Sequence, residues 1–314
     1  MKLDDRFETY DMDILPYFHK THKHEVFLSG CVFSNYEYNA SAFLTEHHYF
    51  CDHVKPITDL MFILECARQA ETYIVHKYEH QSMDTKFILT GWSCEFSDNF
   101  SPVIDLLGQF ISFKITTDNS RRARDKLISQ DYKINVFLNG LCIAKINMSV
   151  KYMTSEAYNK IRIKIINKIN TKAKFIFDKN MNVQPKYVYR RDGDNVVVRM
   201  PEFERDKVTS ELTVNMNNTA YFDHAQDHYP AMVLMEAGKQ NCQLLVSGFN
   251  SGKTPILTAM KSRFLHYAEF DKEVKIVSVK APCAKENQNT FNVRLRQGGV
   301  DIAEMAYTFI MFDF

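Results

Sequence analysis

The chain has no apolar run that approaches the roughly 18 residues needed for a membrane-spanning helix. Its first residues, MKLDDRFETYDMD, are acidic and lack the apolar core of a secretory signal peptide. We therefore expect no membrane span and a cytoplasmic protein.

Cysteine spacing and net charge exclude further classes. The seven cysteines are scattered, with neither metal-ligand spacing nor a disulfide framework, so we predict no metal site. A net charge of +1 gives no general case for nucleic-acid binding. The segment GFNSGKT at residues 248–254 is similar to a phosphate-binding P-loop. It has three residues between its glycines where that motif has four, so it implies no nucleotide.

What the chain does contain is an internal duplication. Phe50–Val75 (FCDHVKPITDLMFILECARQAETYIV) recurs as Tyr221–Val246 (YFDHAQDHYPAMVLMEAGKQNCQLLV) at a constant offset of 171 residues. The positions that are identical in both copies are, in the first, Asp52, His53, Met61, Glu65, Gln69 and Val75. A period of this length indicates a duplicated domain and not a solenoid.

Each copy predicts a buried helix that carries a carboxylate. In the second copy, Pro230 suits the start of a helix, and the residues that follow it are apolar on all sides. Glu236, Lys239 and Gln240 lie three and four residues apart and therefore share a helix face. Their counterparts in the first copy are Glu65, Arg68 and Gln69. A carboxylate in such a helix is unfavourable unless it is paired or takes part in chemistry.

The segments after each helix have the residue alternation of strands, so each unit is predicted to be a long helix followed by a mostly antiparallel sheet, an α+β fold. We expect the first unit at residues 1–153, a basic linker at 154–187 and the second unit at 188–314. The two sheets can join edge to edge with the helices side by side, and Gly238 is small enough to allow the helices to approach closely.

Two basic segments have simple structural interpretations. Asp118–Arg124 (DNSRRAR) predicts a polar loop. Within the linker, Tyr158–Lys174 interleaves lysine and arginine with isoleucine, which predicts a solvated element with one apolar face. The alternative, a docking surface for an acidic carrier protein, is supported by charge alone.

The run Asp223-His224-x-x-Asp227-His228-x-Pro230, followed by Glu236-Ala-x-x-Gln240, resembles a known family. With the duplication, and with His19-Lys20 and Glu65-Cys-Ala-Arg68-Gln69 in the first half, it is similar to the A-factor biosynthesis (AfsA-like) family of double-hotdog proteins. The chain departs from the family in having Ala231 where glycine is usual and Lys239 where arginine is usual. The first repeat also lacks a second Asp-His pair, so the second repeat is the better candidate site.

The resemblance implies a double hotdog fold and an acyltransferase of the γ-butyrolactone signal synthase type. Such enzymes are thought to transfer a β-ketoacyl chain from acyl carrier protein to the hydroxyl of dihydroxyacetone phosphate. The implied partners are an acyl carrier protein or coenzyme A thioester and a small phosphorylated acceptor. No cofactor is implied, because the substrate carries its own phosphopantetheine thioester. Positions that match the family's presumed catalytic residues are Glu65, Glu236 and Lys239.

Acyl transfer to a hydroxyl needs a base, and burial should raise the pKa of Glu236 and make it a stronger one. The N-terminus of the helix after Pro230 could stabilise an oxyanion, and His224 or His228 could carry a proton.

Lys239 or Arg68 could neutralise a substrate phosphate. Asp227 and Gln240 are further candidates for substrate contact.

Each of these residues also has a structural interpretation. Glu236 can be paired with Lys239 or Arg68, and His224 and His228 can bond to backbone. Asp223 and Asp227 can act as caps or turn residues. Gln69 and Gln240 can satisfy buried backbone groups.

Two other functions remain open at this stage. The hotdog fold also hosts acyl-thioester dehydratases, hydratases and thioesterases, and fold alone does not choose between them. A non-catalytic acyl or lactone binder is the third hypothesis. The sequence leaves the oligomeric state, including a homodimer, undetermined.

Overall fold

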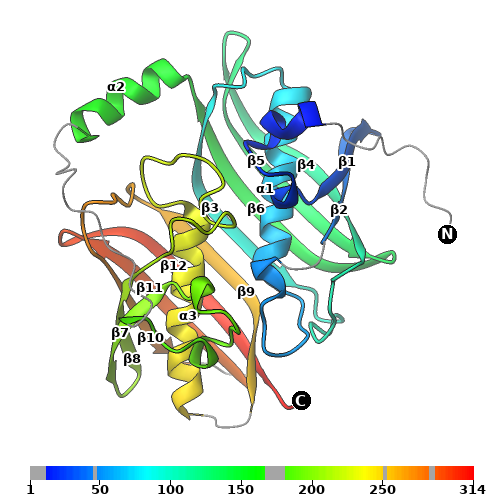
Figure 1. Ribbon diagram of the computed structural model, residues 1–314. Helices are drawn as coiled ribbons and strands as arrows, with labels where there is room; N and C mark the ends of the chain where they lie inside the picture. The colour runs from blue at the N-terminus through cyan, green and yellow to red at the C-terminus, as the bar shows by residue number, and fades with distance from the viewer. Residues whose placement is uncertain (1–11, 45–47, 167–180, 250–252, 283–286) are drawn as a thin grey trace.

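The computed structural model of the chain describes residues 12–44, 48–166, 181–249, 253–282 and 287–314. These residues form a single 12-stranded antiparallel sheet, with two long helices packed on the same face of it (Figure 1). No helix in these ranges is long and apolar enough to cross a membrane.

The first unit consists of six strands around helix α1 (Leu60–Lys77). Its strands are β1 (Leu28–Ser34), β2 (Glu37–Phe43), β3 (Lys86–Phe96), β4 (Phe110–Ala123), β5 (Lys126–Leu138) and β6 (Leu141–Met153). They lie in the order β1-β2-β4-β5-β6-β3. The Asp59 carboxylate starts the helix by accepting a hydrogen bond from the Met61 N–H at 2.8 Å.

The second unit repeats this arrangement around helix α3 (Ala231–Phe249). Its strands are β7 (Val198–Glu204), β8 (Lys207–Leu212), β9 (Thr254–Phe264), β10 (Val274–Ala281), β11 (Gln288–Gln297) and β12 (Val300–Phe312). From the centre of the sheet outwards they run β9-β12-β11-β10-β8-β7. The equivalent strands β3 and β9 pair with each other, with Trp92 opposite Ser262, so the two sheets join edge to edge. The predicted double hotdog fold is confirmed.

The basic segment Asp118–Arg124 is not the predicted loop. Up to Ala123 it continues β4 beyond the body of the sheet, where Asp118 pairs with Asp131 and Arg121 with Ser129 of β5. Its side chains are exposed, and side-chain bonds such as Asn119 to Asp131 and Ser120 to Gln130 add to the backbone pairing of the hairpin.

The linker begins with helix α2 (Ser155–Ile166), which projects beside the sheet (Figure 1). The helix is solvated as predicted, but its isoleucines do not form a packed apolar face, because Ile161 and Ile163 are 51% and 55% exposed. Arg162 is buried instead, and its guanidinium pairs with Asp227 at 2.9 Å and Glu269 at 2.5 Å. Two carboxylates of the second unit thus determine which face of α2 packs inward. The rest of the predicted element, residues 167–174, lies outside the described residues.

Gly238 allows α3 to approach the sheet, not the other helix. A Cβ at this position would lie 2.6 Å from the hydroxyl of Tyr307 on β12. That hydroxyl donates a hydrogen bond to the Met235 carbonyl at 2.8 Å, and the tyrosine is fully buried. The ring is therefore held in place, and no side chain fits between it and α3.

We expect Gly238→Ala to lower the free energy of unfolding by about 1–3 kcal/mol, because overpacking against Tyr307 outweighs the better helix propensity of alanine. Chemical denaturation measures the change. The cost should shrink when the substitution is made in a Tyr307→Phe background, which removes the nearest oxygen. Gly91→Ala is the control, because its Cβ would make an ordinary 3.5 Å contact. A Gly238→Ala protein as stable as the parent would contradict this packing.

Candidate functional site

Glu65, the carboxylate inside α1, is held by three groups. Arg68, one turn further along the helix, binds it through two nitrogens at 2.7 and 2.8 Å. Lys20, from the segment before β1, lies 3.2 Å away. The Gln69 amide donates a third bond at 3.0 Å. Burial would raise the pKa of this carboxyl, but the two cations and these hydrogen bonds hold it well below its usual range.

Glu236, the carboxylate inside α3, is held in the same way but in a fully buried setting. Arg190 donates to it at 2.8 Å and Lys239 lies 2.7 Å away. Gln240 donates to it at 2.8 Å. The side chains of Glu236 and Arg190 are both 0% exposed, whereas that of Arg68 in the first half is 28% exposed.

The predicted rise in the pKa of Glu236 is wrong. Burial alone would raise it, but Arg190 and Lys239 outweigh that effect and lower the pKa below its usual value of 4.5. A carboxylate that is stabilised in its charged form is a weak base. The alternative that pairs Glu236 with Lys239 therefore describes the structure, while Arg68 binds Glu65 on its own helix instead of Glu236.

Asp59 connects the Glu236 cluster to the first unit. Its carboxylate lies 3.4 Å from Lys239 and 3.6 Å from Arg190, so two acids face two bases and the formal charges cancel. Its Oδ2 also bonds the His53 Nε2 at 2.6 Å. The side chains of Glu236, Lys239, Arg190, Asp59 and His53, all buried, are called the charge cluster below.

Arg190, Asp59 and His53 were not among the predicted site residues, although the repeat contains a signal for two of them. Lys20 and Arg190 are 170 residues apart and make equivalent ion pairs, and His53 matches His224 at the repeat offset. Asp59 takes the place of Pro230 and has no such signal.

The helix glutamines have equivalent structural roles. Gln240 accepts a hydrogen bond from the Val197 N–H and donates to the Asn195 carbonyl. Gln69 does the same with the Phe27 N–H and the Glu25 carbonyl. Each amide therefore ties the buried glutamate of its helix to the backbone of the segment before the first strand.

The first Asp-His pair of each repeat holds the opposite unit. Asp223 accepts hydrogen bonds from the backbone N–H groups of Thr21 at 2.6 Å and His22 at 3.0 Å. Asp52 accepts from the Asp192 N–H and from the Asn195 side chain. Each aspartate therefore bonds to the other unit, and the two sets of hydrogen bonds hold the halves together.

The remaining predicted residues lie apart from the charge cluster. Asp227 bonds Arg162 and Tyr158 of α2, and His228 bonds Asp227 at 2.6 Å. The His224 ring is half-exposed and bonds Gln226. These contacts fasten α2 and the turn before α3. Lys239, which was a candidate for a substrate phosphate, is buried and points at two carboxylates.

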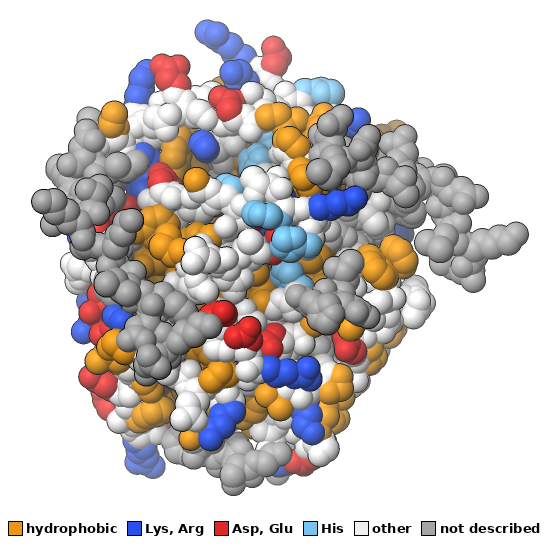
Figure 2. Space-filling view, in the orientation of Figure 1, with side chains coloured by type: hydrophobic (Ala, Val, Ile, Leu, Met, Phe, Trp, Pro, Cys, Tyr) orange, Lys and Arg blue, Asp and Glu red, His pale blue; other side chains and the backbone are white. Residues whose placement is uncertain are grey.

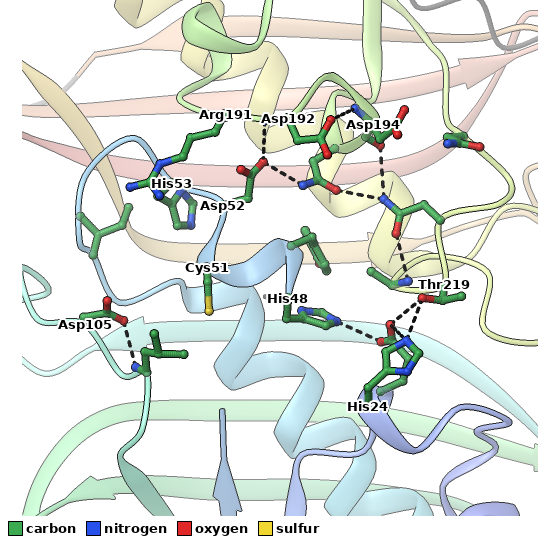
Figure 3. Close-up of a pocket in the computed structure, with 18 of the residues that line it drawn as sticks. His24, His48, Cys51, Asp52, His53, Asp105, Arg191, Asp192, Asp194 and Thr219 are labelled. Carbon is green, nitrogen blue, oxygen red and sulfur yellow. Dashed lines mark hydrogen bonds and ion pairs between the residues drawn. The ribbon is translucent and has the colours of Figure 1, made fainter. Parts of the chain in front are cut away.

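An open groove of about 940 Å³ runs between the two units (Figure 3). One wall comes from residues 48–57 ahead of α1, and the other from residues 191–195 and 215–220 of the second unit. Figure 3 shows His48, Asp52, His53, Asp192 and Thr219 around it. Neither glutamate of the helices lines the groove, but His53 does, so the charge cluster reaches the groove through this histidine.

Several buried polar atoms at this junction have no hydrogen-bond partner among the described residues. They include the hydroxyls of Tyr49 and Tyr221, whose rings lie 4.9 Å apart, and the Nδ1 of His53. Each unpaired buried group costs about 1–3 kcal/mol, so several of them in one place are typical of a site that binds a polar ligand. Tyr49 and His53 both line the groove.

Histidine is concentrated on this side of the molecule. Figure 2 shows histidine side chains gathered near the middle of the face, with acidic side chains beside them. Nevertheless, within the described part of the chain no group of three or more histidine, cysteine, aspartate or glutamate side chains is arranged to hold a metal ion.

We expect Arg190→Met to lower the free energy of unfolding by about 3–5 kcal/mol, because it leaves two buried carboxylates, Glu236 and Asp59, to share the single charge of Lys239. The folded-state pKa values of Glu236 and Asp59 lie below their ordinary 4.5 and 3.8, so these groups add stability above those values and lose it as the pH falls. Without Arg190 the folded-state pKa values should rise toward those of the unfolded chain, so the part of the stability that is lost on acidification should be smaller.

Urea denaturation across a pH series tests both effects. Arg263→Met is the matched control, because Arg263 is paired with Glu304 at the surface and its side chain is 65% exposed. Such a pair contributes about 0–1 kcal/mol. Equal stability of the two variants would show that the charge cluster does not need Arg190.

Comparison with known proteins agrees with this arrangement. The model of the A-factor biosynthesis hotdog domain matches residues 15–154 and again residues 171–313. The 2-oxo-3-(phosphooxy)propyl 3-oxoalkanoate synthase of Streptomyces virginiae is 24% identical over 280 residues, which are 88% of this chain and 90% of that protein.

Solved structures share the fold at low sequence identity. A trans-AT PKS dehydratase domain from Brevibacillus brevis has a TM-score of 0.56 at 11% identity, covering 94% of this chain and 99% of its own. The 12:0-ACP thioesterase from Umbellularia californica has a TM-score of 0.54 at 7% identity, covering 90% of this chain and 100% of its own. The family model accounts for both halves of the duplicated fold, and this chain therefore belongs to the A-factor biosynthesis hotdog family.

Proposed function

We propose that the chain is an acyltransferase that moves a 3-oxoacyl (β-ketoacyl) group from a thioester to the hydroxyl of a small phosphorylated acceptor of the dihydroxyacetone phosphate type. The observation that carries the proposal is the relative from Streptomyces virginiae, which is similar over 88% of this chain. Its name describes an ester between a 3-oxoalkanoate and a 2-oxo-3-(phosphooxy)propyl group. A thioester and a hydroxyl compound give such an ester with release of a thiol.

The groove supports the proposal by its size and position. About 940 Å³ is at the upper end of the 300–1,000 Å³ typical of small-molecule sites. It lies at the join of the two units, beside unpaired polar groups that could bind a carbonyl and a hydroxyl. We expect the acyl group to arrive on the phosphopantetheine arm of an acyl carrier protein or of coenzyme A, so the chain needs no cofactor of its own.

Lys55 and Arg191 are the groove residues suited to the phosphate of the acceptor. Both side chains are exposed and carry a permanent positive charge. Glu25 and Asp52 are acidic residues of the groove lining, and both are already bonded within the protein. Glu25 bonds His48 and Thr219, and Asp52 bonds the second unit. An arginine can bind a phosphate through two nitrogens, whereas a lysine has one. Lys239 is also buried, away from the groove.

The direct test is to incubate the protein with a 3-oxoacyl carrier thioester and dihydroxyacetone phosphate. We expect an ester of the two, detected by mass spectrometry, and a thiol released in equal amount. Release of free acid in place of ester would indicate a thioesterase, and loss of water from a 3-hydroxyacyl thioester a dehydratase. A co-purifying lipid with no turnover of any thioester would indicate a binding protein.

We expect Arg191→Met to raise the KM for the phosphorylated acceptor about 10- to 100-fold, because a charged hydrogen bond contributes about 1.5–3 kcal/mol. The KM for the thioester should stay within two-fold. Arg205→Met is the control, because Arg205 is 96% exposed and does not line the groove. A variant at Arg191 with an unchanged KM for the acceptor would place the phosphate elsewhere.

A further inference from the structure

His53 forms a two-residue unit with Asp59 at the wall of the groove. The His53 Nε2 lies 2.6 Å from the Asp59 Oδ2, and both side chains are more than nine-tenths buried. Asp59 itself is fixed, because its Oδ1 caps α1 and its Oδ2 faces Lys239 and Arg190. The imidazole ring is therefore oriented by a carboxylate that cannot turn away.

The protonation state of the ring follows from its surroundings. Burial and the Arg190 guanidinium lower the pKa of His53 below its usual 6.5, although Asp59 opposes this shift, so the ring is neutral at pH 7. A neutral imidazole carries one hydrogen, and the bond to a carboxylate places that hydrogen on Nε2. Nδ1 is then a lone-pair acceptor, and it has no hydrogen-bond partner among the described residues.

His48 and His53 both line the groove from residues 48–57, and the arrangement found at His53 is absent at His48. The His48 Nε2 bonds Glu25 at 3.0 Å, and its Nδ1 accepts a hydrogen bond from the Phe50 N–H at 3.3 Å. Both nitrogens of His48 are thus occupied by the protein. His53 keeps one nitrogen for a group outside it, at a place where the Tyr49 hydroxyl is also unpaired.

We propose that His53 is the catalytic base of acyl transfer and that Asp59 is its positioning residue. The inference rests on the proposed function. The His53 Nδ1 takes the proton of the acceptor hydroxyl as its oxygen bonds to the thioester carbon. The carbon–sulfur bond then breaks, and the same proton passes from Nδ1 to the leaving sulfur, so thioester and alcohol become ester and thiol. The unpaired Tyr49 hydroxyl is available to donate to the carbonyl oxygen as it gains negative charge.

The test compares the kinetics of three variants in the ester-forming assay. His53→Gln keeps a donor toward Asp59 but removes the base, and should lower kcat about 100- to 10,000-fold with the KM for the thioester within two-fold. Asp59→Asn should lower kcat similarly, because an amide N–H₂ facing Nε2 forces the ring hydrogen onto Nδ1. His76→Gln is the control, since His76 is also buried but bonds His19 and Gln81.

The pH profile separates a base from a structural residue. The groups facing the ring are Asp59, Arg190 and Lys239. The parent protein should lose kcat/KM only on the acid side, below pH 6.5, as Nδ1 becomes protonated. In Asp59→Asn the residual activity should show this limb at still lower pH, because the carboxylate that favours protonation is gone. Thermal unfolding confirms that each variant is folded.

The outcomes distinguish the base assignment from the proposed function. A folded His53→Gln protein that keeps more than half of the parent kcat for ester formation overturns the assignment and leaves the proposed function intact. A parent that releases only free acid, with this activity lost in His53→Gln, overturns the proposed function and keeps His53 as the base for water. A parent that turns over no thioester overturns both.

Discussion

The structure depends on neutralising a carboxylate that lies inside each central helix. Glu65 and Glu236 are buried at matching positions of the two helices, where an unpaired charge would cost several kcal/mol. A cation one turn further along the helix is not sufficient, so each unit adds a second cation from the segment before its first strand, Lys20 or Arg190. The helix glutamine then bonds the backbone of that segment. The ion pairs therefore position the lead-in segments as well as the helices.

The two halves use this scheme to different effect. In the first, the Arg68 side chain is partly exposed and the cluster stays near the surface. In the second, the cations are closed off from solvent, and Asp59 from the other half joins them. Asp59 stands where the second repeat has Pro230, so at this position only the first repeat has a carboxylate, and that carboxylate also bonds His53. The two halves thus hold similar clusters, and the one on α3 includes a histidine, His53, that lines the groove.

This difference changes which residues are suited to chemistry. A glutamate whose charge is stabilised by two cations is better placed to orient its neighbours than to accept a proton. Two residues with an unpaired polar atom, His53 and Tyr49, line the groove. The rest of the charge cluster thus acts as a rigid support that orients His53 at the wall of the groove.

The sequence by itself determined the duplication, the two buried helices and most strands. Helix α1 at Leu60–Lys77 forms where the first copy of the repeat predicts a buried helix, because a run of apolar residues is a local signal. β2, β7 and β8 were not predicted, since segments such as Glu37–Phe43 are rich in small and polar residues and become strands only by pairing with neighbours.

Only the tertiary structure decided how the charged residues are used. Arg190 and Glu236 are 46 residues apart, and Asp59 and Lys239 are 180 apart, so no local pattern reveals either pair. The sign of the Glu236 pKa shift depended on those distant cations, and the inward face of α2 depended on Asp227 and Glu269. A helix pattern predicts that a charged residue is buried, but not which residues pair with it. The partners depend on the tertiary structure, because electrostatic energy depends on distance in space and on exclusion of water.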